Sequence, residues 1–201
     1  MTTLAQPTPS KPTAPAAVAP KVLGDWLREG RFVPMDVVPP PLVLEGHLSV
    51  EAALAAGVRD VHRIWATRPG DRRLRHLRAL ARQRSVLIDE VEPEAIEEVA
   101  SGRTHGGVVA LVGPRRERPV PALLAEVGEG SLVVMLDGIE DPFNHGQAVR
   151  ALYAAGVDGL VERRSWETAL ATVTRASAGT TELMPTARAA SAEEAAAACR
   201  E

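Results

Sequence analysis

The chain has 201 residues, a formal net charge of −3 and 45% hydrophobic residues, which fits one large or two small globular domains. The whole molecule is not a polycation, so any affinity for nucleic acid must come from a local patch of positive charge. Its single cysteine, Cys199, excludes an internal disulfide, and its apolar runs are too short to span a membrane. We expect a cytoplasmic protein without membrane contact.

The first 41 residues predict no compact domain. Residues 1–20 are rich in Pro, Ala and Thr and lack the apolar core of a signal peptide, so we expect a disordered tail. Residues 21–41 predict a connecting segment, because Pro34 and the run 39–41 keep the backbone extended.

Residues 42–113 predict a small α/β domain. The expected strands and helices alternate along the chain: strands at 42–44, 61–66, 86–88 and 107–112, and helices at 49–56, 71–84 and 93–100. Such an alternation implies two or three layers around a mostly parallel sheet. Trp65, at the end of a strand, is expected in the core.

This first domain carries a local excess of positive charge. From Arg59 to Arg84 there are nine arginines and two acids. On the helix 71–84, helical spacing gathers four of the arginines on one face, away from the leucines: Arg72, Arg75, Arg78 and Arg82. Such a face can line an RNA backbone. A solvated helix surface fits the same pattern, and the acids between Asp89 and Glu98 could neutralise it.

Residues 114–130 predict a linker with a short helix, and 131–136 predict a buried strand that is central in its sheet. A polar loop follows, and then a helix from about His145 to Ala155 with Asn144 as its N-cap. Val149 lies on the apolar stripe of this helix, and Arg150 lies opposite that stripe.

The remaining residues continue the α/β pattern. A second strand is expected at 157–161, a helix at 168–178 ended by Gly179, and a third strand at 181–187. Ser191 and Glu194 have the spacing of a capping box, which opens a last helix to Arg200.

Residues 136–161 resemble the first conserved motif of the SpoU-type RNA ribose 2'-O-methyltransferases, a branch of the SPOUT superfamily with a deep trefoil knot. The family pattern is a strand, then Asp-Pro-x-Asn-x-Gly, three residues and Arg. Every fixed position is present between Asp141 and Arg150. The residues 42–113 resemble the substrate-binding domain that often precedes it, at Leu44-Glu45-Gly46 and at the stretch 105–110.

The resemblance implies transfer of a methyl group from S-adenosylmethionine to a ribose 2'-hydroxyl of rRNA or tRNA, by a homodimer. It places Arg150 at that hydroxyl, either as proton acceptor or as electrostatic positioner. The second role is physically easier, because a guanidinium stays protonated in almost all settings. Asn144 would orient Arg150 or the loop backbone, Glu140 could pair with Arg150, and Asp141 and Gly146 would support the loop.

Simpler interpretations accompany these roles. Asn144 could be only a helix cap and Arg150 a surface arginine. His145 stands where the family has an apolar residue and is interpreted as a tolerated change. The other histidines show no metal-ligand spacing, so no metal is expected.

The chain departs from the family after Arg150. No Gly-x-Glu loop and no Ser-x-Asn pair follow, although the family has two such motifs there, which form the knot and hold the cofactor. We therefore expect a partial methyltransferase domain at 131–201 that lacks the knot and is inactive alone, with apolar sheet surface uncovered. A non-catalytic RNA-binding remnant is the alternative. An unrelated nucleotide-binding α/β protein is disfavoured, because Gly138, Gly146 and Gly159 form no dinucleotide fingerprint.

Overall fold

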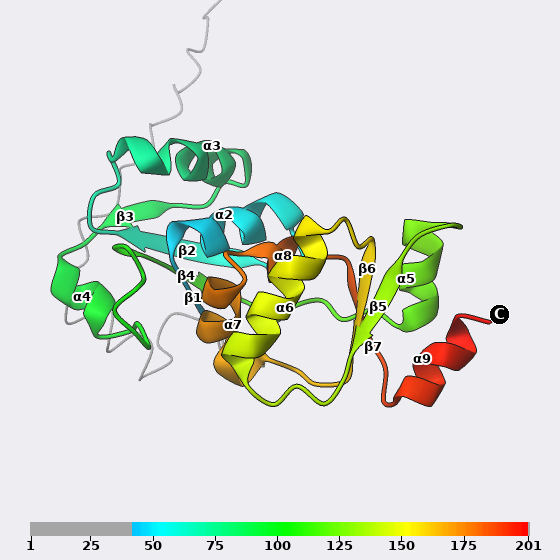
Figure 1. Ribbon diagram of the computed structural model, residues 1–201. Helices are drawn as coiled ribbons and strands as arrows, with labels where there is room; N and C mark the ends of the chain where they lie inside the picture. Colours follow the sequence, from blue (N-terminus) through cyan, green and yellow to red (C-terminus); the bar gives the residue numbers. More distant parts are fainter. Residues whose placement is uncertain (1–41, 201) are drawn as a thin grey trace, which may run out of the picture.

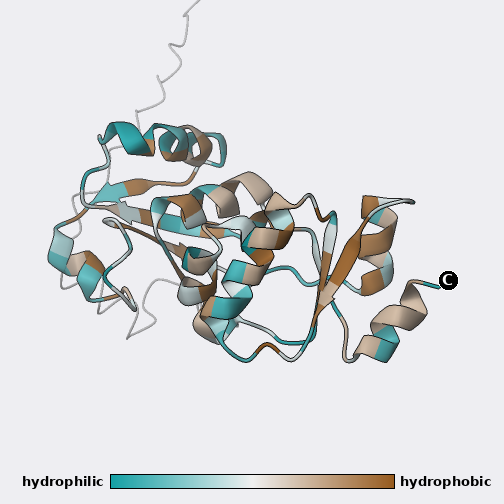
Figure 2. Ribbon diagram, viewed as in Figure 1, coloured by the Kyte–Doolittle hydropathy of each residue, from teal (hydrophilic) through white to brown (hydrophobic). Residues whose placement is uncertain are grey.

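The computed structural model describes residues 42–200, which form two sheets with helices on their faces (Figure 1). The expectations for residues 1–20 and 21–41 lie outside this range. Colouring by hydropathy shows the apolar residues concentrated on the strands and on the helix faces that contact them (Figure 2). The mixed α/β architecture expected from the sequence is confirmed.

The first sheet has the strand order β1-β4-β2-β3. Its strands are β1 (Leu42–Glu45), β2 (Val61–Ala66), β3 (Ile88–Glu90) and β4 (Val108–Val112). Of the three neighbouring pairs only β2 and β3 are parallel, because β4 is antiparallel to both β1 and β2, so the expected mostly parallel pairing is wrong. The cause is α4 (Pro93–Glu97), which at 5 residues is too short to return the chain to the opposite end of the sheet.

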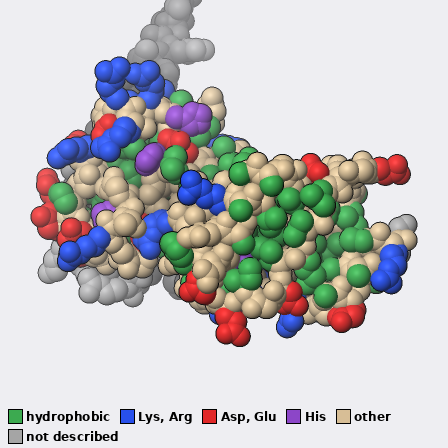
Figure 3. Space-filling model, in the orientation of Figure 1, with side chains coloured by type: hydrophobic (Ala, Val, Ile, Leu, Met, Phe, Trp, Pro, Cys, Tyr) green, Lys and Arg blue, Asp and Glu red, His purple; other side chains and the backbone are tan. Residues whose placement is uncertain are grey.

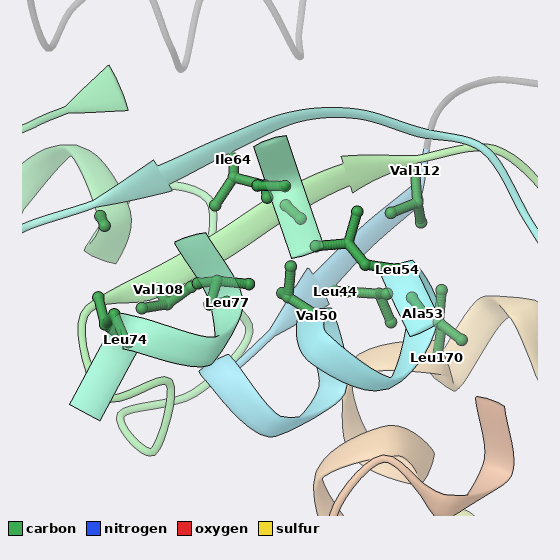
Figure 4. Packing of buried hydrophobic residues seen from close by; sticks show 13 residues of the cluster. Leu44, Val50, Ala53, Leu54, Ile64, Leu74, Leu77, Val108, Val112 and Leu170 are labelled. Atoms are coloured by element: carbon green, nitrogen blue, oxygen red, sulfur yellow. The ribbon is translucent and has the colours of Figure 1, made fainter. Parts of the chain in front are cut away.

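Helices cover both faces of this sheet because alternate strand residues point to opposite sides. Ile64 and Val108 belong to the core under α2 (His47–Ala56) and α3 (Arg75–Gln83), shown in Figure 4. Their neighbours Trp65 and Val109 pack on the other face with Ile96 of α4. Trp65 is only 3% exposed, which confirms it as a core residue.

The second sheet is parallel throughout, in the order β5-β6-β7. Its strands are β5 (Val133–Leu136), β6 (Gly159–Glu162) and β7 (Thr186–Arg188). One face is covered by α6 (Pro142–Ala154) and α8 (Thr180–Leu183), and α7 (Leu170–Ala176) packs on α6. The other face is covered by α5 (Val120–Val127) and α9 (Ala192–Ala198) (Figure 1).

Two expectations for this half need correction. The segment 181–187 is not one strand, because its first residues form α8, where Glu182 is buried against the first half of the chain. Within residues 42–200, β5 is an edge strand and not a central one. All four of its residues are half-buried, and Leu132 just before it is 58% exposed. Apolar side chains are visible on this side in Figure 3.

A buried ion pair joins the two halves. Arg59, which follows α2, is 4% exposed, and Glu182 of α8 is 1% exposed. The guanidinium donates from Nε to Oε2 at 2.8 Å and from Nη2 to Oε1 at 3.2 Å, and its Nη1 donates to the carbonyl of Gly113 at 2.9 Å. Two parallel hydrogen bonds fix the relative direction of both side chains, so this pair orients α8 against the first sheet.

The two halves also approach each other closely where Gly179 lies beside α2. Gly179, at the start of α8, has a φ of +85°, and a Cβ there would lie 2.7 Å from the carbonyl oxygen of Leu48 in α2. A side chain would therefore separate α8 from α2. A second ion pair, between Arg175 of α7 and the buried Glu45 of β1, lies at the same junction.

We predict that Arg59→Ala lowers the free energy of unfolding by about 3–5 kcal/mol, because it leaves the Glu182 carboxylate buried without its partner. Urea unfolding of the whole chain measures this change. The control is Arg73→Ala, which removes an exposed pair with Asp71 and should change stability little. Equal stability of the two variants would contradict the role of the buried pair.

Candidate functional site

The loop after β5 leads directly into helix α6. The Asp141 side chain accepts a hydrogen bond from the backbone N–H of Asn144 at 2.7 Å, so Asp141 is the N-cap. Asn144 lies inside the first turn, and its expected role as the cap is wrong. The helix starts earlier because Pro142 has the backbone angle of the first helical position and needs no N–H partner there.

Gly146 is the point of closest approach between α6 and α7. A Cβ at this position would lie 2.6 Å from the carbonyl oxygen of Val173 and 2.7 Å from the Cβ of Ala176. Only glycine allows the two helices to pack at this separation. Gly146 therefore supports the site by letting α6 pack closely on α7, and not by shaping the loop before α6.

His145 is 2% exposed and holds α6 against the end of β6. Its Nε2 lies 2.7 Å from Oε1 of Glu162, and its ring stacks on Trp166 with centroids 4.6 Å apart and an angle of 27° between the planes. Its interpretation as a tolerated change overlooked this contact. In the sequence, Glu162 at the end of β6 and Trp166 soon after it are visible, but neither residue reveals that it contacts His145.

Arg150 and Asn144 are both exposed on α6. Val149 is fully buried, as the expected apolar stripe requires. At about 100° per residue, Arg150 shares a face with Phe143 and lies about 10 Å further along the axis, whereas Asn144 lies about 120° around the helix from Arg150. No hydrogen bond between residues 42–200 joins Asn144 to Arg150, so any orienting effect of Asn144 is not by direct contact in this structure.

The expected pairing of Glu140 with Arg150 does not form. Glu140 precedes the helix, while Arg150 lies more than two turns into it, and this separation keeps the charged groups apart. The carbonyl of Glu140 instead accepts a hydrogen bond from Nη1 of Arg164 at 3.4 Å. Within the described range, Arg150 has no ion-pair partner, which leaves its guanidinium open to solvent.

Three of the four arginines expected to face RNA are exposed: Arg72, Arg75 and Arg82, called here the α3 basic face. Arg78 is half-buried and donates to the carbonyls of Pro69 and Asp71, so it supports the turn before α3. Arginine side chains gather over α3 in Figure 3. Ala95 and Ile96 of α4 pack on the opposite face of the sheet, whereas Glu92, just before α4, lines a hollow together with Arg68 and Arg73.

Asp71 fixes the start of the segment that carries this face. Its carboxylate accepts from the side chain of Arg73 and from the Arg73 backbone N–H at 2.8 Å. These hydrogen bonds lower the pKa of Asp71 to about 2. The cap is therefore charged at neutral pH, and the short helical turn 72–74 continues directly into α3.

Two family models match this chain, one over each half. Residues 43–118 match the model for RNA 2'-O ribose methyltransferase substrate binding, and residues 131–201 match the SpoU rRNA methylase family. The chain belongs to the SpoU family. The resemblance seen in the sequence from Asp141 to Arg150 is thereby confirmed.

Curated relatives are similar over parts of their length. A 23S rRNA (guanosine-2'-O-)-methyltransferase RlmB of Vibrio cholerae is 35% identical over 125 residues, which cover 60% of this chain and 50% of that protein. An uncharacterized tRNA/rRNA methyltransferase of Synechocystis is 31% identical over 152 residues, covering 73% of this chain and 39% of that protein. The chain therefore spans about half the length of these relatives.

Solved structures share the fold. The AdoMet-bound rRNA methyltransferase from Sinorhizobium meliloti has a TM-score of 0.62 at 22% identity, covering 90% of this chain and 64% of that one. The SpoU methyltransferase AviRb from Streptomyces viridochromogenes, in complex with AdoMet, has a TM-score of 0.60 at 19% identity, covering 89% and 65%.

The loop that follows β5 is open to solvent in this structure. The loop 137–141 at the end of β5 is mostly exposed, and its Asp137 pairs with Arg163 at 3.2 Å. The neighbouring edge of β5 has no strand beside it in the described range. These residues alone do not enclose a nucleoside. The same range contains no cluster of potential metal ligands and no helix able to cross a membrane.

We predict that Gly146→Ala lowers the free energy of unfolding by about 1–3 kcal/mol, because its methyl group must displace the α7 backbone. Thermal or urea unfolding measures the loss. Gly70→Ala is the matched control, since nothing lies within 4 Å of its Cβ position. A Gly146→Ala variant as stable as Gly70→Ala would show that α6 and α7 do not pack as described.

Proposed function

We propose that this chain supplies the RNA-binding surface and the ribose-positioning helix of an S-adenosylmethionine-dependent RNA 2'-O-methyltransferase acting on rRNA or tRNA. One observation carries the proposal: the exposed Arg150 of the family motif and the α3 basic face belong to one body, joined by the buried pair between Arg59 and Glu182. We further propose a homodimeric enzyme in the cytoplasm, where these RNAs act.

The proposed reaction needs a ribose 2'-hydroxyl held in place and polarised. Arg150 presents a guanidinium with several N–H donors and no ion-pair partner within residues 42–200, so it is available to the ribose and an adjacent phosphate. We assign it to electrostatic positioning, because a guanidinium is a poor proton acceptor. Asp141, His145 and Gly146 act on this residue indirectly, by fixing the start and the packing of α6.

S-adenosylmethionine would supply the methyl group. Under this proposal, residues 42–200 contribute the ribose side of the reaction. An RNA-binding protein without methyl transfer would share the α3 basic face, and a methylation assay separates the two functions.

We predict that Arg75→Ala weakens binding of single-stranded RNA several-fold and reduces the slope of log affinity against log salt by roughly 0.7, the value for one lost phosphate contact. Fluorescence anisotropy over a range of salt concentrations measures both quantities. Arg200→Ala, which removes an exposed arginine at the far end of the chain, serves as control. Equal losses in both variants would show that the α3 basic face is not the RNA-binding surface.

In a catalytically active form of this enzyme, we predict that Arg150→Ala lowers the methylation rate by about 10²–10³-fold, because the removed donor acts on the reacting ribose. RNA affinity should change little, as measured by the same anisotropy assay. Arg150→Lys keeps the positive charge but lacks the planar guanidinium with its paired N–H donors, so it should recover only part of the rate. Full turnover by Arg150→Ala would remove this residue from the mechanism.

A further inference from the structure

A cavity of about 400 Å³ lies at the junction of the two halves. This volume falls within the range of roughly 300–1,000 Å³ that is typical of small-ligand sites. Residues from β1, α2 and the loop before β4 line it on one side, and residues from α6 and α7 line it on the other. The side chains relevant here are His47, Leu48, His105, Phe143, Thr172 and Arg175.

The floor of this cavity is preorganised. Glu45, 1% exposed, accepts hydrogen bonds from the Ser101 backbone N–H at 2.5 Å, from the Ser101 hydroxyl at 2.8 Å and from the Arg175 guanidinium. A Cβ on Gly102 would lie 3.1 Å from Nη1 of Arg175, so the absence of a side chain there makes room for the guanidinium. Arg175 is thus held in one position without any ligand.

The walls offer an aromatic face and polar groups. Phe143 is 52% exposed and Leu48 is 49% exposed, so both side chains are accessible to a ligand in the cavity. Nδ1 of His105 accepts the Gly107 backbone N–H at 3.1 Å, so Nε2 is the donor nitrogen of this ring. A flat ligand could therefore stack on Phe143 and accept hydrogen bonds from His105 and Arg175.

Further hollows connect this cavity with the α3 basic face. An adjacent cavity of about 560 Å³ shares His47 and Gly106 with it, and its charged lining residues are two arginines and two acids: Arg68, Arg73, Asp71 and Glu92. A third, beside α3, shares Arg73 with the second and includes Arg72 and Arg75. The hollows thus share lining residues from α3 to α6, and the one beside α3 is lined by arginines without acids.

We propose that the junction cavity binds one unstacked nucleobase of the substrate RNA, close to the nucleotide whose ribose meets Arg150. This inference rests on the proposed function. Phe143 and Arg150 lie on the same face of α6 about 10 Å apart along its axis, a separation that neighbouring nucleotides of an extended strand can bridge. Aromatic stacking on a splayed base is the usual way in which proteins recognise single-stranded RNA.

The test compares two short probes with the same number of phosphates, an oligoadenylate and an abasic ribose-phosphate strand. The 201-residue chain should bind the oligoadenylate more tightly. Phe143→Leu should weaken oligoadenylate binding roughly tenfold and leave binding of the abasic strand unchanged, because only base stacking is lost. Since Phe143 is half exposed, the variant should fold normally, as circular dichroism can verify.

Tyr153→Leu is the matched control, because it removes a 41%-exposed aromatic residue from the same helix outside the cavity. It should leave the affinity for both probes unchanged. Equal affinity of the wild-type chain for both probes, or an unchanged Phe143→Leu, would overturn the nucleobase site while leaving RNA binding intact. Failure of the wild-type chain to bind either probe would overturn the proposed RNA-binding function itself.

Discussion

The arrangement of this molecule depends on the buried ion pair between Arg59 and Glu182. Both side chains are almost fully removed from water. Loss of one partner would leave the other charge buried and unpaired, which lowers the free energy of unfolding by about 3–5 kcal/mol. Because the pair is bidentate, it fixes the direction as well as the distance of α8 relative to the first sheet. The close approach of Gly179 to α2 and the pair between Glu45 and Arg175 act at the same junction. The two halves consequently present their surfaces in a fixed relation.

The family motif divides into supporting and exposed residues. Asp141 caps α6, Gly146 lets it pack on α7, and His145 joins it to β6. Asn144 and Arg150 remain exposed on a helix whose position these contacts determine. Rigid placement of a polar group before substrate arrives is the condition for electrostatic positioning to be effective. Under the proposed function, this division means that Arg150 contacts the ribose while the buried residues of the motif fix the position of α6.

Local patterns predicted much of this structure, and long-range contacts account for the errors. Apolar runs and caps located most of the helices and strands between 42 and 200, and helical spacing placed Val149 inside and Arg150 outside. The direction of β4 was missed because the alternation of elements does not reveal how short α4 is. The segment at α8 was predicted as strand because its apolar content does not reveal the partner of Glu182, 123 residues away. The contacts of His145 with Glu162 and Trp166 could not be predicted for the same reason.

The contacts at the junction hold α3 and α6 in one relative position in the free protein. Pulsed electron spin resonance measures it most directly, with spin labels at Gln83→Cys and Gln147→Cys, both exposed sites, in a chain whose native cysteine is removed by Cys199→Ser. We expect a single narrow distance distribution in the free protein, which broadens when Arg59→Ala breaks the buried pair. A broad or multiple distribution in the chain with Arg59 intact would contradict it.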